Sequence, residues 1–218
     1  MARRGKWAHP DIADAGINGS LHQRASTDLP TEWGKFRALA FEREFARAGR
    51  TLRETAVVLM MGNLMTTPPL VRIHSQCLTG DALGSRRCDC GMQLRLSLAM
   101  IAAEGRGALI YEEQEGRGIG LIAKLQAYEL QDLGYDTVEA NARLGLKNDY
   151  RDFSTAGSIL KVLGITRVRL LTNNPEKITA LEQQGIKVVQ RVSCEPDPGP
   201  TARAYIKTKQ QKLGHLML

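Results

Sequence analysis

The stretch that decides the fold class is "ALIYEEQEGRGIGLIAKLQAYELQDLG", residues 108–134. Its short apolar run at 108–112 predicts a strand, and the glycine-rich segment at 115–118 predicts a turn. Residues 119–133 predict a helix, which Gly134 closes. The order strand, glycine turn, helix indicates an α/β fold.

Working outward from this stretch, the same signals predict further strands and helices along the chain. Their mixture without strict alternation indicates one α/β domain around a mixed β-sheet with flanking helices. Residues 1–27 show neither the periodicity of a helix nor that of a strand, and they are expected to be a flexible extension. Residues 28–218 are then the domain. The expected strands are 56–62, 70–74, 168–172 and 186–192, and the expected helices contain residues 94–101, 154–163, 175 onward and 201–214.

Composition and charge bound the function before any motif does. The 218 residues are 43% hydrophobic, enough for a core, and the formal net charge of +7 suits an anionic partner such as a nucleotide. Aromatic residues make up only 5%, which disfavours a single-stranded nucleic-acid binder that stacks bases. Neither a membrane span nor a signal peptide is recognisable, so a cytoplasmic protein is expected.

Three cysteines lie close together in "CLTGDALGSRRCDCG", residues 77–91. In a reducing compartment Cys77, Cys88 and Cys90 are expected to be metal ligands or buried thiols rather than disulfide partners. Zinc prefers such ligands in a tetrahedron. Spacing does not decide between an open catalytic site and a structural site closed by His74 or Cys194.

Two segments have the pattern of anion-binding turns. "QEGRGIG" (114–120) lies between a predicted strand and a helix, where backbone N–H groups and Arg117 could bind a phosphate. "LLTNNPEK" (170–177) repeats this arrangement, with Lys177 in the first turn of a helix. Taken alone, each pattern also fits an ordinary turn or helix cap.

Five motifs follow one another along the chain: "RIHSQCLTGDALGSRRCDCGMQL" (72–94), "QEGRGIGL" (114–121), "GYDTVEAN" (134–141), "DYRDF" (149–153) and "LLTNNPEK" (170–177). Together they resemble the GTP cyclohydrolase II family. The resemblance runs from about residue 29 to the end and implies a homodimeric hydrolase. Such an enzyme uses one Zn²⁺ per chain, and Mg²⁺ with the substrate phosphates. It opens the imidazole ring of GTP and releases formate and pyrophosphate, giving 2,5-diamino-6-ribosylamino-4(3H)-pyrimidinone 5′-phosphate for riboflavin biosynthesis.

The resemblance also implies roles for individual residues. Cys77, Cys88 and Cys90 match the zinc ligands of an open site, so that His74 and Cys194 are not needed as ligands. Asp149 matches the proton acceptor, Arg151 the nucleophile at the α-phosphorus, and Tyr128 a tyrosine associated with formate release. The positions that match nucleotide-binding residues are Arg72, Ile73, His74, Ser75, Gln76, Gln93, Glu115, Gly116, Arg117, Thr137, Thr172 and Lys177.

Chemistry and spacing leave some of these roles open. A guanidinium is a poor nucleophile, so Arg151 is better suited to stabilising charge in the transition state. Tyr128 could instead be a core residue on an apolar helix face with Leu121 and Leu125. Gln76 stands where the family commonly has glutamate, and residues 112–113 (two glutamates) where a basic residue is more usual, which bears on substrate affinity and identity.

Two other functions remain possible at this point. A paralogue could stop at the formamide intermediate or serve another pathway. A nucleic-acid-binding protein with a structural zinc is the alternative from a different class.

Overall fold

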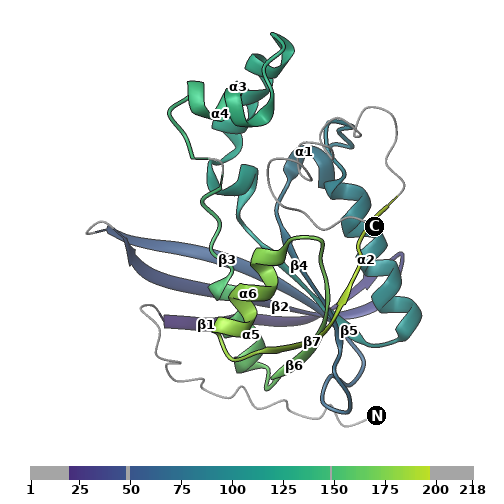
Figure 1. Ribbon diagram of the computed structural model, residues 1–218. Coiled ribbons are helices and arrows are strands. Elements are labelled where there is room, and N and C mark those ends of the chain that lie inside the picture. Colours follow the sequence, from purple (N-terminus) through teal and green to yellow (C-terminus); the bar gives the residue numbers. More distant parts are fainter. Residues whose placement is uncertain (1–19, 48–49, 148, 197–218) are drawn as a thin grey trace.

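The structure, a computed structural model, describes residues 20–47, 50–147 and 149–196 (Figure 1). In this part of the chain seven strands form one mixed sheet in the order β1-β2-β3-β5-β4-β6-β7. Neighbours from β1 to β5 pair antiparallel, and β5, β4, β6 and β7 run parallel. The strands are β1 Ser20–Thr31, β2 Gly34–Arg47, β3 Arg50–Met61, β4 Leu70–Ser75, β5 Gly107–Glu112, β6 Arg167–Leu171 and β7 Lys187–Val192.

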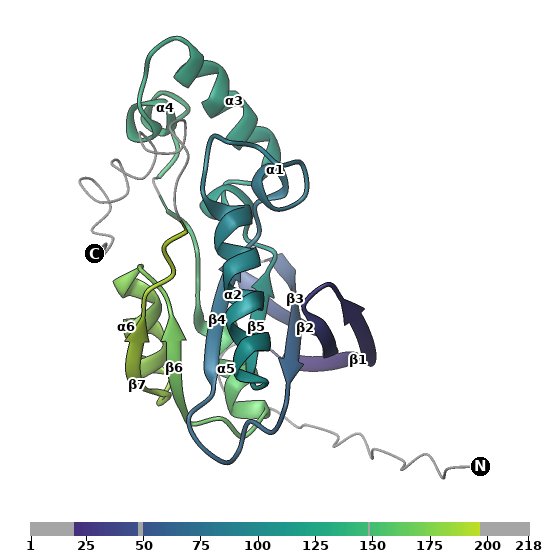
Figure 2. The same ribbon diagram turned by 90° about the vertical axis from the view of Figure 1, so that its right-hand side faces the viewer.

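Helices flank this sheet on both faces, which confirms the predicted α/β class. In Figures 1 and 2, α2 lies along one face, α5 and α6 lie on the other, and α3 and α4 stand beyond one end of the strands. Within the described residues no helix is both long and apolar enough to span a membrane. The helices are α1 Leu78–Asp81, α2 Cys90–Glu104, the 3₁₀ turn η1 Glu115–Gly118, α3 Leu121–Asp132, α4 Thr137–Arg143, α5 Ser154–Val162 and α6 Pro175–Gln183.

The central strand β4 is buried on both faces, as expected for a parallel strand covered by helices. Ile73 packs in the cluster that contains Ile159 of α5, whereas Leu70 packs with Ile101 of α2. All four side chains are fully buried, and such burial contributes about 1.5–3 kcal/mol per large aliphatic side chain. The two clusters hold the helices on the sheet and so fix the loops between them.

The amino-terminal boundary differs from the prediction. Residues 20–27 were assigned to an extension, but they belong to β1, which pairs with β2 from Ser20 to Thr31. The strand expected at 56–62 is also longer, since β3 begins at Arg50. Residues 1–19 and the helix expected at 201–214 lie outside the described residues.

The parallel strands place the functional motifs. The carboxyl ends of β4, β5 and β6 point the same way, and the loops that follow them contain the cysteine segment, the glycine-rich turn and the Thr-Asn-Asn-Pro segment. Ligands of open α/β sheets bind at such carboxyl ends. Motifs about 100 residues apart in the sequence therefore meet at one edge.

Candidate active site

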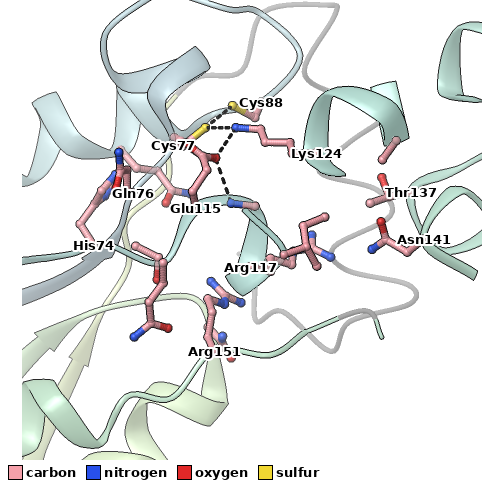
Figure 3. Close-up of a pocket in the computed structure, with 18 of the residues that line it drawn as sticks. His74, Gln76, Cys77, Cys88, Glu115, Arg117, Lys124, Thr137, Asn141 and Arg151 are labelled. Atoms are coloured by element: carbon pink, nitrogen blue, oxygen red, sulfur yellow. Dashed lines mark hydrogen bonds and ion pairs between the residues drawn. The ribbon is translucent and has the colours of Figure 1, made fainter. Parts of the chain in front are cut away.

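A pocket opens at the carboxyl ends of β4, β5 and β6, beneath α3 and α4 (Figure 3). Two of the residues predicted for the site, Ile73 and Asp149, are not among those that line it. The predicted residues that do line it are Arg72, His74, Ser75, Gln76, Cys77, Cys88, Cys90, Gln93, Glu115, Gly116, Arg117, Tyr128, Thr137, Arg151, Thr172 and Lys177.

The three cysteines converge at one end of this pocket. Their sulfur atoms all lie within 4.8 Å of one another, and Cys77 Sγ is 3.6 Å from Cys88 Sγ. Tetrahedral zinc with Zn–S bonds of about 2.3 Å separates two sulfurs by about 3.8 Å, so the spacing fits zinc. Gly80 leaves room for the sulfurs, because a Cβ there would lie 2.8 Å from Cys88 Sγ.

Hydrogen bonds within this group also favour a thiolate. Those from Cys88 and Cys90, and then Lys124, hold the pKa of the Cys77 thiol far below its usual value, although burial opposes the shift. A thiolate is the form of cysteine that binds a metal. The three donor atoms therefore suit a divalent ion such as zinc, and the charge does so at Cys77, whereas the hydrogen bond with Cys77 raises the pKa of Cys88 to about 11.

A fourth protein ligand does not join the group among the described residues. His74 Nε2 lies 3.1 Å from both carboxylate oxygens of Asp81, and burial lowers the pKa of His74 despite this contact. Cys194 lies elsewhere, with its sulfur 3.4 Å from Ser97 Oγ. The fourth position of a tetrahedron would be left to a water molecule or a substrate, as in catalytic zinc sites.

The glycine-rich turn has an unusual backbone. Gly116 and Arg117 both have φ of 61°, and Arg117 is the one described non-glycine residue with positive φ. The Gly116 N–H donates to Glu115 Oε1 at 2.9 Å, and the Arg117 carbonyl accepts from the Tyr150 N–H at 2.9 Å. This turn thus presents Arg117 to the pocket and fixes the start of the loop that carries Arg151.

Lys124 is a buried residue of the site that sequence reasoning missed. Its Nζ lies 3.1 Å from Cys77 Sγ and 2.7 Å from Glu115 Oε1, as the dashed lines of Figure 3 show. It shares one face of α3 with Ala127, Tyr128 and Gln131, which also line the pocket. A search for polar residues at helical spacing on α3 could have found it.

Tyr128 faces the same pocket rather than an apolar core. Its ring lies under the guanidinium of Arg87, 4.8 Å away, and 5.8 Å from Lys124 Nζ. Leu125, which was expected to share an apolar face with it, is 42% exposed, so that alternative is wrong. Burial raises the pKa of Tyr128, which keeps the phenol protonated at neutral pH.

Arg151 is held by Asp149 in a two-pronged ion pair, with Nε 3.0 Å from Oδ1 and Nη2 2.5 Å from Oδ2. Burial alone would raise the pKa of Asp149, but the hydrogen bonds and charge of Arg151 lower it. The loop is anchored by Gln114, whose Nε2 donates to the Asp152 carbonyl at 2.7 Å and to Glu54 Oε1 at 2.8 Å. Gln114 was also missed, because its partners are distant in sequence.

Two further cations, Lys177 and Arg72, also line the pocket. Lys177, at the start of α6, donates to the Ile73 carbonyl at 2.8 Å, and Arg72 donates to Gln93 Oε1 at 2.7 Å. The side chain of Ile73 is fully buried in the core, and its backbone carbonyl is the group that meets Lys177. Asn174 caps α6 through the Glu176 N–H, the normal cap that was the simpler alternative for this segment.

The pocket also contains residues without a predicted role. They belong to the turn, to α3, to α4 and to the loop before α6. Asn141 is 4% exposed and follows Thr137 by one turn of α4, so that both face the pocket (Figure 3). The unpredicted lining residues are Gln114, Ile119, Lys124, Ala127, Gln131, Asn141, Asn173 and Asn174.

Comparison with known proteins identifies the family of this chain. The family model for GTP cyclohydrolase II matches residues 22–193. The chain is 50% identical over 198 residues to the GTP cyclohydrolase-2 of Enterobacter sp. (strain 638), covering 90% of this chain and 98% of that protein. It is 48% identical over 199 residues to the riboflavin biosynthesis protein RibBA of Chlorobium phaeovibrioides, covering 90% of this chain and 47% of that protein.

Among solved structures, a two-domain 3,4-dihydroxy-2-butanone 4-phosphate synthase, RibBX from A. baumannii, matches 81% of this chain and 40% of that chain. The identity is 17% and the TM-score 0.41. The family model and the sequence relatives therefore carry the assignment. On their evidence, the chain is a hydrolase that belongs to the GTP cyclohydrolase II family.

Proposed function

We propose that this protein opens the imidazole ring of GTP and releases formate and pyrophosphate, in the first step of riboflavin biosynthesis. The product would be 2,5-diamino-6-ribosylamino-4(3H)-pyrimidinone 5′-phosphate. The observation that carries the proposal is a triad of thiols at one end of a pocket whose other walls contain Arg72, Arg117, Arg151 and Lys177. This arrangement suits a substrate with a reactive ring and several phosphates.

Cys77, Cys88 and Cys90 would hold the zinc ion. Zinc, when bound, supplies a Lewis acid that activates water near neutral pH. The glycine-rich turn, Arg72 and Lys177 would bind the phosphates and neutralise the charge that develops as pyrophosphate leaves. Mg²⁺ would enter with the phosphates, as hard cations do.

Asp149 and Arg151 would act at the α-phosphate. Their two-pronged contact keeps the guanidinium charged and oriented, which supports stabilisation of negative charge more than nucleophilic attack. Tyr128 would orient the formamide or a water molecule in the second hydrolysis, since its protonated phenol can donate and accept hydrogen bonds. A homodimer and a cytoplasmic location complete the proposal, on the family resemblance alone.

The direct test is incubation with GTP, Zn²⁺ and Mg²⁺, followed by mass analysis of the products. We expect the diamino product with equal amounts of formate and pyrophosphate. Formamide without formate would favour the paralogue that stops at the intermediate. Salt-dependent binding to DNA or RNA without GTP turnover would favour the nucleic-acid alternative.

A cysteine pair provides the matched control. Cys88→Ser should lose zinc and ring opening, whereas Cys194→Ser, the same change at a buried cysteine outside the triad, should keep the metal. Full zinc content and full activity in Cys88→Ser would contradict the assignment of the ligands.

A further inference from the structure

Lys124 has an ammonium group buried between two negatively charged partners. The residue is 8% exposed, and its Nζ contacts Cys77 Sγ at 3.1 Å and Glu115 Oε1 at 2.7 Å. An unpaired ammonium in such a place would cost several kcal/mol. The position therefore requires anionic partners that are present in the functional protein.

Glu115 is one of the two partners of this lysine, and it is held in place by the backbone. Its Oε2 accepts from the Leu78 N–H at 2.7 Å, and its Oε1 accepts from the Gly116 N–H at 2.9 Å. An ionised carboxylate has about four acceptor sites, so Glu115 takes both backbone donors and the ammonium of Lys124, which also reaches the sulfur of Cys77. Glu115 in turn links the residue after Cys77 to the glycine-rich turn.

We propose that Lys124 is a positioning residue of the zinc site, whose ammonium fixes the Cys77 sulfur and offsets the negative charge of the three thiolate ligands. This inference rests on the zinc site proposed above. Zinc with three thiolates carries a net negative charge, which is unfavourable in a buried pocket without a nearby cation. Through Glu115, Lys124 also ties the metal-binding segment to the turn expected to bind nucleotide.

The backbone of the turn is shaped to admit this lysine. A Cβ at Gly116 would lie 3.2 Å from the Cβ of Lys124 and 2.9 Å from Cγ1 of Ile119. Glycine at 116 therefore allows α3 to approach closely enough for Lys124 to reach Cys77.

The test measures zinc binding without GTP. Zinc-loaded parent and Lys124→Gln proteins are titrated with a competing chelator, and their folds are compared by circular dichroism. Loss of a residue that contacts a metal ligand typically weakens metal binding about 10- to 100-fold, and we expect this for Lys124→Gln. Lys124→Arg, which keeps the charge, should bind zinc more tightly than Lys124→Gln.

Lys161→Gln is the matched control, because Lys161 is an exposed lysine on α5 whose hydrogen bond goes to Gln184 at 3.5 Å. It should bind zinc like the parent. If Lys124→Gln does not fold, Lys124→Met makes the same test, since its unbranched side chain fills similar space without a polar end.

A cobalt-substituted protein separates an electrostatic role from a packing role. Without the ammonium the Cys77 sulfur becomes richer in electrons, so the thiolate-to-cobalt charge-transfer band should move to lower energy. Unchanged zinc affinity in a folded neutral variant would overturn the proposal, and so would weaker binding with an unmoved band. The parent protein's turnover of GTP is measured separately, so failure of the proposed function would be recognised independently.

Discussion

Glu112 should make the stability of this protein fall as the pH rises. It ends β5 and is fully buried. Within the described part of the chain, neither carboxylate oxygen has a hydrogen bond of normal length and angle. Burial raises the pKa of Glu112 from 4.5 to about 8; the charge of Glu54 adds to the shift, while Lys177 and the Ala156 N–H oppose it. The folded protein therefore keeps this carboxyl protonated at neutral pH.

The magnitude follows from this shift. Between pH 4.5 and about 8 the folded state retains a proton that the unfolded chain has released, so each pH unit lowers the free energy of unfolding by about 1.4 kcal/mol. The whole window of about 3.5 units amounts to about 5 kcal/mol. Below pH 4.5 both states are protonated and the effect is absent.

Glu112→Gln removes the ionisation and keeps the shape of the side chain. Urea unfolding of zinc-loaded parent and variant, followed by circular dichroism from pH 4 to pH 9, gives the difference in stability at each pH. We expect the free energy of unfolding of the variant, relative to that of the parent, to rise between pH 4.5 and about 8. The difference should level off above pH 8. Titrating groups that do not interact with Glu112 cancel in the comparison.

Glu113→Gln is the matched control, because Glu113 is the exposed neighbour and contacts Thr55 at the surface. A pH course in this exposed variant as steep as that of Glu112→Gln would mean that the burial of Glu112 is not the cause. A difference for Glu112→Gln that stays constant with pH would refute the reasoning, since it would mean that Glu112 ionises alike in the folded and unfolded states.

Three further changes test the site and its scaffold. Arg151→Lys replaces a two-pronged contact with a point charge and should lower kcat about 10- to 100-fold, whereas near-parental turnover would remove Arg151 from the chemistry. Tyr128→Met should still open the ring but accumulate the formamide, and equal formate per GTP from the folded variant and the parent would exclude this role. Asp136→Ala removes the capping box that Asp136 forms with Glu139 at the start of α4. It should cost about 1 kcal/mol and lower Tm by about 2–4 °C in a thermal scan, and an unchanged Tm would show that this cap contributes nothing.

The parallel half of the sheet was predictable because its signals are local. The strand at 70–74 and the strand at 108–112 are apolar runs bounded by turn residues, and β4 and β5 occupy these positions. Gly105, in the left-handed conformation with φ of 62°, ends α2 as glycine commonly does after a helix. Buried strands and glycine caps are specified by neighbouring residues, so sequence patterns reveal them.

The antiparallel half was not predictable in the same way. β2 contains many charged residues, and most positions along β1 are exposed. Their register depends on pairing with each other and with β3 rather than on an apolar pattern of their own. Tertiary context of this kind overrides local propensity.

The site divides along the same line. The close spacing of the three cysteines predicted the thiol triad, and the glycine-rich turn predicted the place of Arg117 in the site. Helical spacing with Tyr128 on α3 is the one local signal for Lys124, and Gln114 has none. Each is defined mainly by partners from other segments: Cys77 and Glu115 for the lysine, and residues 54 and 152 for the glutamine. Buried polar networks are visible only once the chain is folded.

The backbone at Arg117 is strained at a residue to which the proposed function gives a role in phosphate binding. A non-glycine residue with φ of 61° carries a strain of about 1–2 kcal/mol, which glycine would relieve. A laboratory evolution experiment that selects for heat resistance alone should therefore accept Arg117→Gly, while selection for growth through GTP turnover should reject it. An effort to raise the thermal stability of this enzyme should therefore keep Arg117 and change residues in the helix caps and the exposed strands instead.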